Sequence, residues 1–353
     1  MTLSAFIDRS RTETENWKYT NLSALLTALP VSLVTNAKST VPAASDHARF
    51  VFIDGVWQSK QSTFGSIPSC IFMGDLESGY KLTLGEHTCL VAQPIEFVFA
   101  SSEKAPREVA LKLSIDVGDN GRLTLLETYL TSPSLVTLDA DITLHRRAKF
   151  VHGKIVHGGV HLATTKVQVA SGGYYNNFSL LRGVHPARNE IDVSLNGEEA
   201  QAALNGMMLL RHSEHADTTT RITHQAPHCA SRQIYKTILD GKARGVFQGK
   251  IIVAQDAQKT DGYQLSRALL LSDQAEMDAK PELEIYADDV KCSHGSTIGD
   301  LDENALFYLR ARGLSETEAR ALLIQSFVTE MLDEIQVEDW REVFRREIEG
   351  WAL

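Results

Sequence analysis

The segment Cys292-Ser293-His294 places a thiol and an imidazole two residues apart. On an extended strand, side chains at positions i and i+2 point to the same face, so Cys292 and His294 can be offered to one iron ion together. The same pattern is also typical of a buried cysteine beside a structural histidine. The two residues alone do not decide between these interpretations.

Eight of the other eleven histidines fall into three groups, and ordinary structure explains each group better than a metal site does. The first lies on a β-like stretch whose spacings fit no helical metal motif, so we expect solvent-facing strand residues. The second is a polar turn, which predicts exposed loop residues, and the third surrounds the turn-forming Ala226-Pro227. The groups are His145, His152, His157 and His161; His212 and His215; and His224 and His228 with Cys229.

Sequence motifs of enzyme active sites have even less support in this chain than a metal site has. The four cysteines are too widely spaced for a C-x-x-C dithiol, and we expect reduced thiols. The sequence has no G-x-S-x-G, H-E-x-x-H, G-x-G-x-x-G or P-loop pattern. Asp288-Asp289 is a carboxylate pair of the kind used by β-helical enzymes that act on polysaccharide, but adjacent strand residues point to opposite faces. We therefore expect no enzyme, and an independent polysaccharide enzyme is the alternative function.

The elements that must position these residues are short β-like runs, broken by Gly, Asn and Asp about every dozen residues between positions 90 and 298. Helix-period segments are nearly missing there, which excludes a doubly wound α/β fold. The regular spacing, and the echo of Leu195-Asn196-Gly197 in Leu204-Asn205-Gly206, favour a β-solenoid. A β-sandwich would show the same alternation within each run and stays open at this level.

Helical patterns flank the β region on both sides. Residues 15–29 predict a short amphipathic helix, and a polar stretch follows it. Residues 299–353 predict an acidic helical module, with 13 acidic against 6 basic side chains. We expect three regions: an N-terminal cap and linker at 1–45, a β core at 46–298 and the C-terminal module at 299–353. Apolar stripes in that module exceed what it can bury against itself, so we expect part of them to bind a partner: Leu306, Leu309, Leu322, Leu323 and Phe327.

The charge balance narrows the class of partner. The chain has 35 Lys and Arg against 45 Asp and Glu, a formal net charge of −10. Such a chain is a poor ligand for nucleic acid or for an anionic membrane surface. It has no apolar run near the roughly 20 residues of a spanning helix and no secretory leader pattern. We expect a cytoplasmic protein whose partners are proteins or small molecules.

Four longer motifs go beyond these local patterns. They are E-N-W-K-Y-T-N-L at 15–22, H-Q-A-P-H-C-A-S-R-Q at 224–233, G-K-A-R-G-V-F-Q-G-K at 241–250 and K-P-E-L-E-I-Y-A-D-D-V-K-C-S-H-G at 280–295. Together they closely resemble the SufB/SufD family of iron–sulfur cluster assembly proteins. The resemblance runs from about residue 15 to residue 327 and so covers nearly the whole chain.

This resemblance implies a right-handed parallel β-helix core with helical ends. It also implies a noncatalytic scaffold that pairs with a SufB-like subunit and docks a SufC-like ATPase on its C-terminal helices, and that can form a homodimer in isolation. The SufD branch fits better, because Leu265 stands where a SufB-like chain is expected to carry a cluster-building cysteine. His294 then resembles the SufD contribution to a cluster site shared with the partner subunit, and Cys292 is a second candidate ligand. The iron–sulfur cluster would be transient, and we expect none to be held stably by this chain alone.

Overall fold

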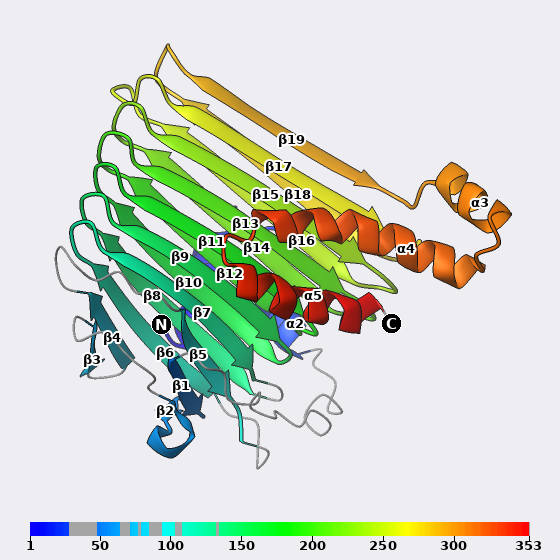
Figure 1. Ribbon diagram of the computed structural model, residues 1–353, viewed down its shortest axis with the longest axis horizontal. Coiled ribbons are helices and arrows are strands. Elements are labelled where there is room, and N and C mark those ends of the chain that lie inside the picture. The colour runs from blue at the N-terminus through cyan, green and yellow to red at the C-terminus, as the bar shows by residue number, and fades with distance from the viewer. Residues whose placement is uncertain are drawn as a thin grey trace.

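The computed structural model describes residues 1–27, 48–63, 71–76, 79–84, 94–102, 108–131 and 134–352. It is mainly β, with 51% strand and 21% helix. A parallel β-solenoid of about 7 turns forms the body, and helices lie at both ends of the chain (Figure 1). The solenoid prediction is thereby confirmed over the sandwich.

Successive strands of the solenoid alternate between two sheets. Sheet A contains, in spatial order, β19 (Lys291–Gly299), β17 (Asp261–Leu270), β15 (Ala230–Leu239), β13 (Gln201–Leu210), β11 (Tyr174–Arg182), β9 (Lys149–His157), β7 (Arg122–Leu130), β5 (Ile95–Ala100), β1 (Ala48–Ile53) and β2 (Val56–Trp57). Sheet B contains β18 (Glu276–Ile285), β16 (Arg244–Val253), β14 (His215–His224), β12 (Ala187–Leu195), β10 (Val160–Val169), β8 (Leu135–Leu144), β6 (Glu108–Val117), β4 (Gly79–Leu84) and β3 (Ile71–Leu76). From β5 onward every pairing between described strands is parallel.

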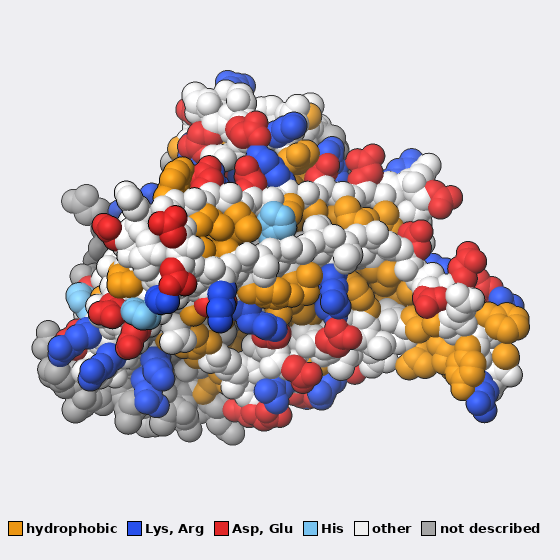
Figure 2. Space-filling model, turned by 90° about the horizontal axis from the view of Figure 1, so that it is seen from above, with side chains coloured by type: hydrophobic (Ala, Val, Ile, Leu, Met, Phe, Trp, Pro, Cys, Tyr) orange, Lys and Arg blue, Asp and Glu red, His pale blue; other side chains and the backbone are white. Residues whose placement is uncertain are grey.

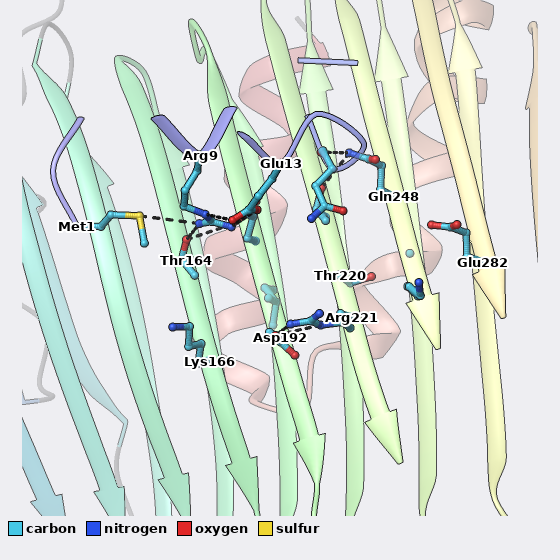
Figure 3. A pocket seen from close by; sticks show the side chains of 16 residues that line it. Met1, Arg9, Glu13, Thr164, Lys166, Asp192, Thr220, Arg221, Gln248 and Glu282 are labelled. Atoms are coloured by element: carbon cyan, nitrogen blue, oxygen red, sulfur yellow. Dashed lines mark hydrogen bonds and ion pairs between the residues drawn. The ribbon is translucent and has the colours of Figure 1, made fainter. Parts of the chain in front are cut away.

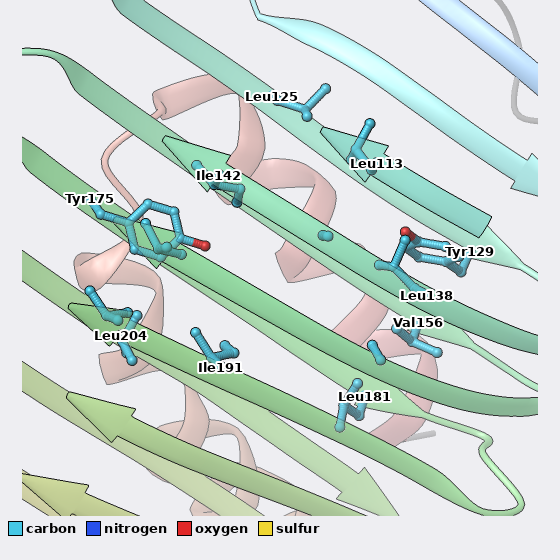
Figure 4. Close-up of a cluster of buried hydrophobic side chains, with 14 of the residues drawn as sticks. Leu113, Leu125, Tyr129, Leu138, Ile142, Val156, Tyr175, Leu181, Ile191 and Leu204 are labelled. Atoms are coloured by element: carbon cyan, nitrogen blue, oxygen red, sulfur yellow. The ribbon is translucent and has the colours of Figure 1, made fainter. Parts of the chain in front are cut away.

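The core lies between the two sheets and follows from simple alternation. In β6, the side chains at 109, 111, 113, 115 and 117 are buried and apolar, while most of those between them are exposed or half-buried. Because the strand repeat is two residues, this pattern aims one apolar face at the opposite sheet. Figure 4 shows such inward side chains from several coils, among them Leu113, Leu138 and Leu204.

The turns that lead from sheet B back to sheet A stack on one another as regularly as the strands do. Asn120, Arg147, Glu199, His228 and Lys259 all adopt a positive φ of about 56 to 63° at the same point of successive coils. Their backbone N–H groups each donate to the carbonyl of a residue in the next turn, as Arg147 does to Ser171 at 2.9 Å. This ladder satisfies turn backbone that strand pairing cannot reach.

A cluster of polar side chains lies inside the solenoid, where the sequence predicts surface histidines. Tyr129 donates a hydrogen bond to Glu127 at 2.9 Å, while His152 Nε2 and Lys154 Nζ lie 3.3 and 3.9 Å from the same carboxylate. His161 is also fully buried, and it packs edge-on against Tyr129. The expectation of solvent-facing residues is therefore wrong for His152 and His161, because both fall on the inward face of their strands.

The electrostatics of this cluster depend on its neighbours. Burial alone raises the pKa of the Glu127 carboxyl, but His152, Lys154 and Tyr129 together outweigh burial and lower that pKa to about 2. The ionised carboxylate therefore stabilises the fold above the ordinary glutamate pKa, and this contribution is lost as the pH falls toward 2. For His161, burial is the main reason that its pKa falls to about 3, so its ring is neutral in the core.

An N-terminal strap, residues 1–27, crosses the outer face of sheet B. It contains α1 (Leu3–Thr12) and α2 (Leu22–Thr27). Trp17 stacks on the guanidinium of Arg188 at 4.0 Å, and Arg188 also donates to the carbonyl of Asn16 and forms an ion pair with Asp217. The helix predicted for residues 15–29 is wrong over its first turns, because Trp17 and the Thr20 hydroxyl are used to dock the strap, with Thr20 donating to Asp217 at 2.5 Å.

The C-terminal helical elements are α3 (Glu303–Ala311), α4 (Glu316–Thr329), the 3₁₀ turn at Glu330–Glu334 and α5 (Glu338–Ala352). Of the C-terminal helices, α4 and α5 lie along the outer face of sheet A, α3 projects beyond the strands, and the end of the solenoid is left uncovered (Figure 1). Trp340, Phe344 and Ile348 of α5 are buried against sheet A, where Phe344 meets Phe178 edge-on at 4.9 Å. Over the described residues, no helix is both long enough and apolar enough to span a membrane.

We predict that replacing Glu127 by Gln destabilises the protein although the side chain keeps its size. The amide leaves the buried Lys154 ammonium without its carboxylate, and breaking a buried ion pair from one side costs roughly 3 kcal/mol or more of unfolding free energy. Urea unfolding followed by circular dichroism measures the loss. Adding Lys154→Met to Glu127→Gln should recover part of it, because the unpaired charge is then removed.

The matched control is Asp116→Asn, which removes a carboxylate from an exposed pair with His145. Its cost should stay below about 0.5 kcal/mol. Equal midpoints for Glu127→Gln and Asp116→Asn would show that the interior cluster does not stabilise the solenoid.

Candidate functional site

The last coil of the solenoid has an open edge. β18 pairs only with β16 and β19 only with β17, so the outer backbone edge of each strand has no strand beside it within the described chain. The side chains of β18 are mostly half-buried and those of β19 mostly exposed, in contrast to the buried coils beneath them. Figure 2 looks onto this end of the molecule, where apolar side chains lie in bands between ridges of backbone.

Cys292 and His294 lie on β19, as the sequence predicts, and share one face of that strand. Cys292 is half-buried against an apolar cluster that includes Ile251 and Val253, and burial raises the pKa of its thiol. The glycine at 262 gives the sulfur its space, since a Cβ there would lie 3.2 Å from Cys292 Sγ. The His294 imidazole is exposed and has no hydrogen bond or ion pair to any other described residue. The thiol is thus held in place, and the imidazole is available.

A row of buried amides lies behind His294. In the parallel register, His294 stands beside Gln264 of β17, which stands beside Gln233 of β15. Gln264 accepts from Gln233 at 3.4 Å and donates to the carbonyl of Gly249 at 3.2 Å. A Cβ at Gly249 would come within 2.4 Å of Gln264 Nε2, so any other residue there would displace this buried amide. Sequence reasoning missed these glutamines, whose only local signal is a polar residue in an otherwise apolar strand.

The remaining histidine groups do not converge on a metal. His224 faces the interior, 2.9 Å from the Ser231 hydroxyl, whereas His228 lies in a stacked turn and Cys229 Sγ donates to the Gly197 carbonyl at 3.2 Å. His215 is buried under the strap, 3.1 Å from Thr20 Oγ1, which corrects the expectation of an exposed loop residue. Among the described residues, no three His, Cys, Asp or Glu side chains lie close enough to hold a metal ion.

The carboxylate pair Asp288-Asp289 lies in the last corner turn, between β18 and β19. Asp289 forms an exposed ion pair with Lys259, and Asp288 is exposed. Neither lines the groove described below between the strap and sheet B. The two carboxylates therefore do not face each other across a cleft, as glycoside hydrolysis requires.

A second exposed surface lies on α3 and the start of α4, which project beyond the strands (Figure 1). Phe307, Tyr308 and Leu322 are 76%, 57% and 45% exposed. Leu306, Leu309 and Leu323, which sequence reasoning selected as partner-binding, are half-buried. Phe327, also selected, packs toward sheet A, where Lys236 Nζ lies 4.6 Å from the centre of its ring. Sequence reasoning missed Phe307 and Tyr308, because it selected the stripe of Leu306 and Leu309, which are half-buried in α3.

Comparison with known proteins adds a family to this geometry. Residues 98–327 match the family model described as "SUF system FeS cluster assembly, SufBD core domain". The chain is 30% identical to the iron–sulfur cluster assembly protein SufD of Escherichia coli, over 93% of this chain and 86% of that protein.

Two further relatives point the same way. Identity is 29% to the iron–sulfur cluster assembly SufBD family protein slr0076 of Synechocystis, over 91% of this chain and 83% of that protein. It is 30% to the chloroplastic protein ABCI7 of Arabidopsis thaliana, over 74% and 58%. The matched region contains the whole coil stack from β7 to β19 as well as α3, so the chain belongs to the SufB/SufD family of iron–sulfur cluster assembly proteins, in its SufD branch.

Proposed function

We propose that this protein is a noncatalytic scaffold subunit for iron–sulfur cluster assembly, which pairs through its open solenoid end with a SufB-like subunit and binds a SufC-like ATPase through α3 and α4. The observation that carries the proposal is the uncovered last coil with His294 exposed on its outermost strand. Family membership supports the role in cluster assembly. The open edge and the exposed His294 support pairing with a partner at this end of the solenoid.

The open edge is better covered by a second β-solenoid than left exposed to water. Unpaired strand edges are ready to pair with another strand, and most proteins cover or blunt them. Here Ile285, Tyr286 and Ile298 are 40%, 64% and 47% exposed at this end. A partner solenoid that continues both sheets would bury these side chains and satisfy the free backbone groups. In the absence of that partner, two copies of this chain can meet through the same edge as a homodimer.

The ligand count supports a cluster that is shared. Iron–sulfur centres are usually held by four protein ligands. This edge offers the His294 imidazole and, second, the Cys292 thiol, whose raised pKa keeps it protonated until a cation draws off the proton. The other ligands would come from the partner subunit. The cluster is thus the cargo of a site that is complete only in the complex.

We predict that His294→Ala lowers the iron and sulfide content of the complex purified with co-expressed SufB-like and SufC-like partners by at least about tenfold. The side chain is exposed and contacts no described partner, so folding should be unaffected. Cys292→Ser should lower the content less, because its sulfur is a second candidate ligand. The measurements are iron and sulfide per complex and the thermal melt of the single chain, which by itself should hold no stable cluster.

His145→Ala is the matched control. His145 is also exposed, but it lies in the corner turn between β8 and β9. Its complex should contain as much iron and sulfide as the wild type. If the His294→Ala complex contained as much iron and sulfide as the wild type, His294 would not be a cluster ligand.

The projecting α3 and α4 offer a docking surface of the right kind for the ATPase. None of the residues of α3 is buried, although Phe307 and Tyr308 are large and aromatic. Exposed aromatic side chains dominate the binding energy of many interfaces. Acidic side chains such as Glu303 and Glu316 lie beside them and would steer a basic partner surface.

We predict that the double variant Phe307→Ser/Leu322→Ser weakens binding of the SufC-like ATPase at least about tenfold, because both side chains lose their apolar contact. Truncation before α3 is not a clean alternative, since it would uncover the apolar outer face of sheet A. Binding is measured by titration calorimetry with the purified ATPase.

The control is Val343→Ser, which changes another exposed apolar residue, 38% exposed on α5. Its affinity should match the wild type, and both variants should melt within a few degrees of it. Full-strength binding by Phe307→Ser/Leu322→Ser would place the ATPase elsewhere on the chain.

A further inference from the structure

A groove of about 550 Å³ lies between the N-terminal strap and the outer face of sheet B (Figure 3). Its roof is formed by the strap, including Arg9, Glu13 and Asn16, and its floor by β10, β12, β14, β16 and β18. Gln248 of β16 donates to the carbonyl of Asn16 at 3.1 Å and fixes the roof to the floor. The volume falls in the range of small-molecule sites.

Three cations from one register row form a rim of this groove. Lys166 pairs in register with Asp192, Asp192 with Arg221, and Arg221 with Lys250. Arg221 and Lys250 are therefore neighbours on adjacent strands, roughly 5 Å apart, and Lys166 lies two strand spacings from Arg221, roughly 10 Å away. Like charges on adjacent strands repel unless something between them is negative.

Four carboxylates line the groove, and each has a cationic partner: Asp192 accepts from Arg221, Glu282 lies 3.5 Å from Lys280, and Glu13 and Glu190 bind arginines. Both oxygens of Glu13 accept from Arg9. Glu190 accepts from Arg188 on one oxygen and from Thr164 on the other, where Arg9 lies 3.0 Å away. Glu190 binds the strap to the sheet and Glu13 holds Arg9 within the strap, so both offer little to a cationic ligand.

The cations, by contrast, have donors to spare. Arg221 directs two of its N–H groups to one oxygen of Asp192, which leaves its Nη1 group unused. Lys250 has a single carboxylate partner, Glu284, at 2.5 Å. Lys166 is exposed and has no ion pair or side-chain hydrogen bond with the described residues. Lys166 and Arg221 Nη1 thus supply donors on positive groups that no described residue uses.

We propose that this groove binds a small molecule that carries two phosphate groups, one held by Lys166 and the other by Arg221 together with Lys250. A phosphate has several acceptor oxygens, so it can bridge a guanidinium and an ammonium at adjacent strand positions. The separation of the two cationic points selects a ligand whose phosphates are spaced apart over one whose phosphates are adjacent. This proposal does not involve His294, and it does not depend on the proposed role in cluster assembly.

The test uses the full chain in low-salt buffer with fructose 1,6-bisphosphate as the probe of separated phosphates. Pyrophosphate, inorganic phosphate and citrate probe adjacent charge, single charge and carboxylate chemistry. We expect the bisphosphate at about 100 times its Kd to raise the melting temperature by about 2–4 °C. In calorimetry, it should bind at least about tenfold more tightly than the other three probes.

Lys166→Gln and Lys250→Gln should each weaken binding of the bisphosphate about tenfold. Lys242→Gln, which changes an exposed lysine in a corner turn away from the groove, should bind like the wild type. Equal affinity in all three variants would overturn the proposal, as would citrate or inorganic phosphate binding as tightly as the bisphosphate. An absence of any shift with a correctly folded protein would overturn it as well.

Discussion

The in-register stacking of parallel coils is the constraint on which the rest of this structure depends. Each described strand from β5 to β17 pairs on both sides, and the stacked corner turns extend the same ladder around the edge. Buried backbone groups must be paired, so a strand cannot slip without unpairing its neighbours and turning apolar side chains outward. The ladder can end only at an open edge, and this is where Cys292 and His294 lie.

Stacking also decides what the two ends of the chain do. Each sheet has an outer face as well as an inner one. The N-terminal strap lies on the outer face of sheet B, and α4 and α5 lie on the outer face of sheet A. The strap seals sheet B through Arg188 and Trp17, and α5 seals sheet A through Trp340 and Phe344. The last coil and the projecting α3 are left uncovered by these two contacts. The proposed scaffold role would need this arrangement, because the cluster site would be completed by the partner.

Much of the fold follows from patterns along the chain, and the misses have physical causes. The short β-like runs predicted between positions 90 and 298 correspond to observed strands of the solenoid, because alternation is a local property. In β9, β11 and β14 the apolar alternation is interrupted, because the polar side chains of Lys154, Asn177 and Thr218 are buried in the interior. The supposed turn repeat at Asn205-Gly206 lies within β13 instead. Gly206 is there because a Cβ would come within about 2.8 Å of Ser179 and Tyr235.

The sequence by itself determined that Cys292 and His294 share one face of a strand, because a two-residue spacing has that result on any extended backbone. Its motifs also indicated the family. Only the tertiary structure decided that His294 is exposed, that Gln264 and Gln233 stand behind it, and that Lys166, Arg221 and Lys250 border one groove. These residues come from coils far apart in sequence, and their proximity is set by strand register, a property of the stacked coils that no local pattern carries.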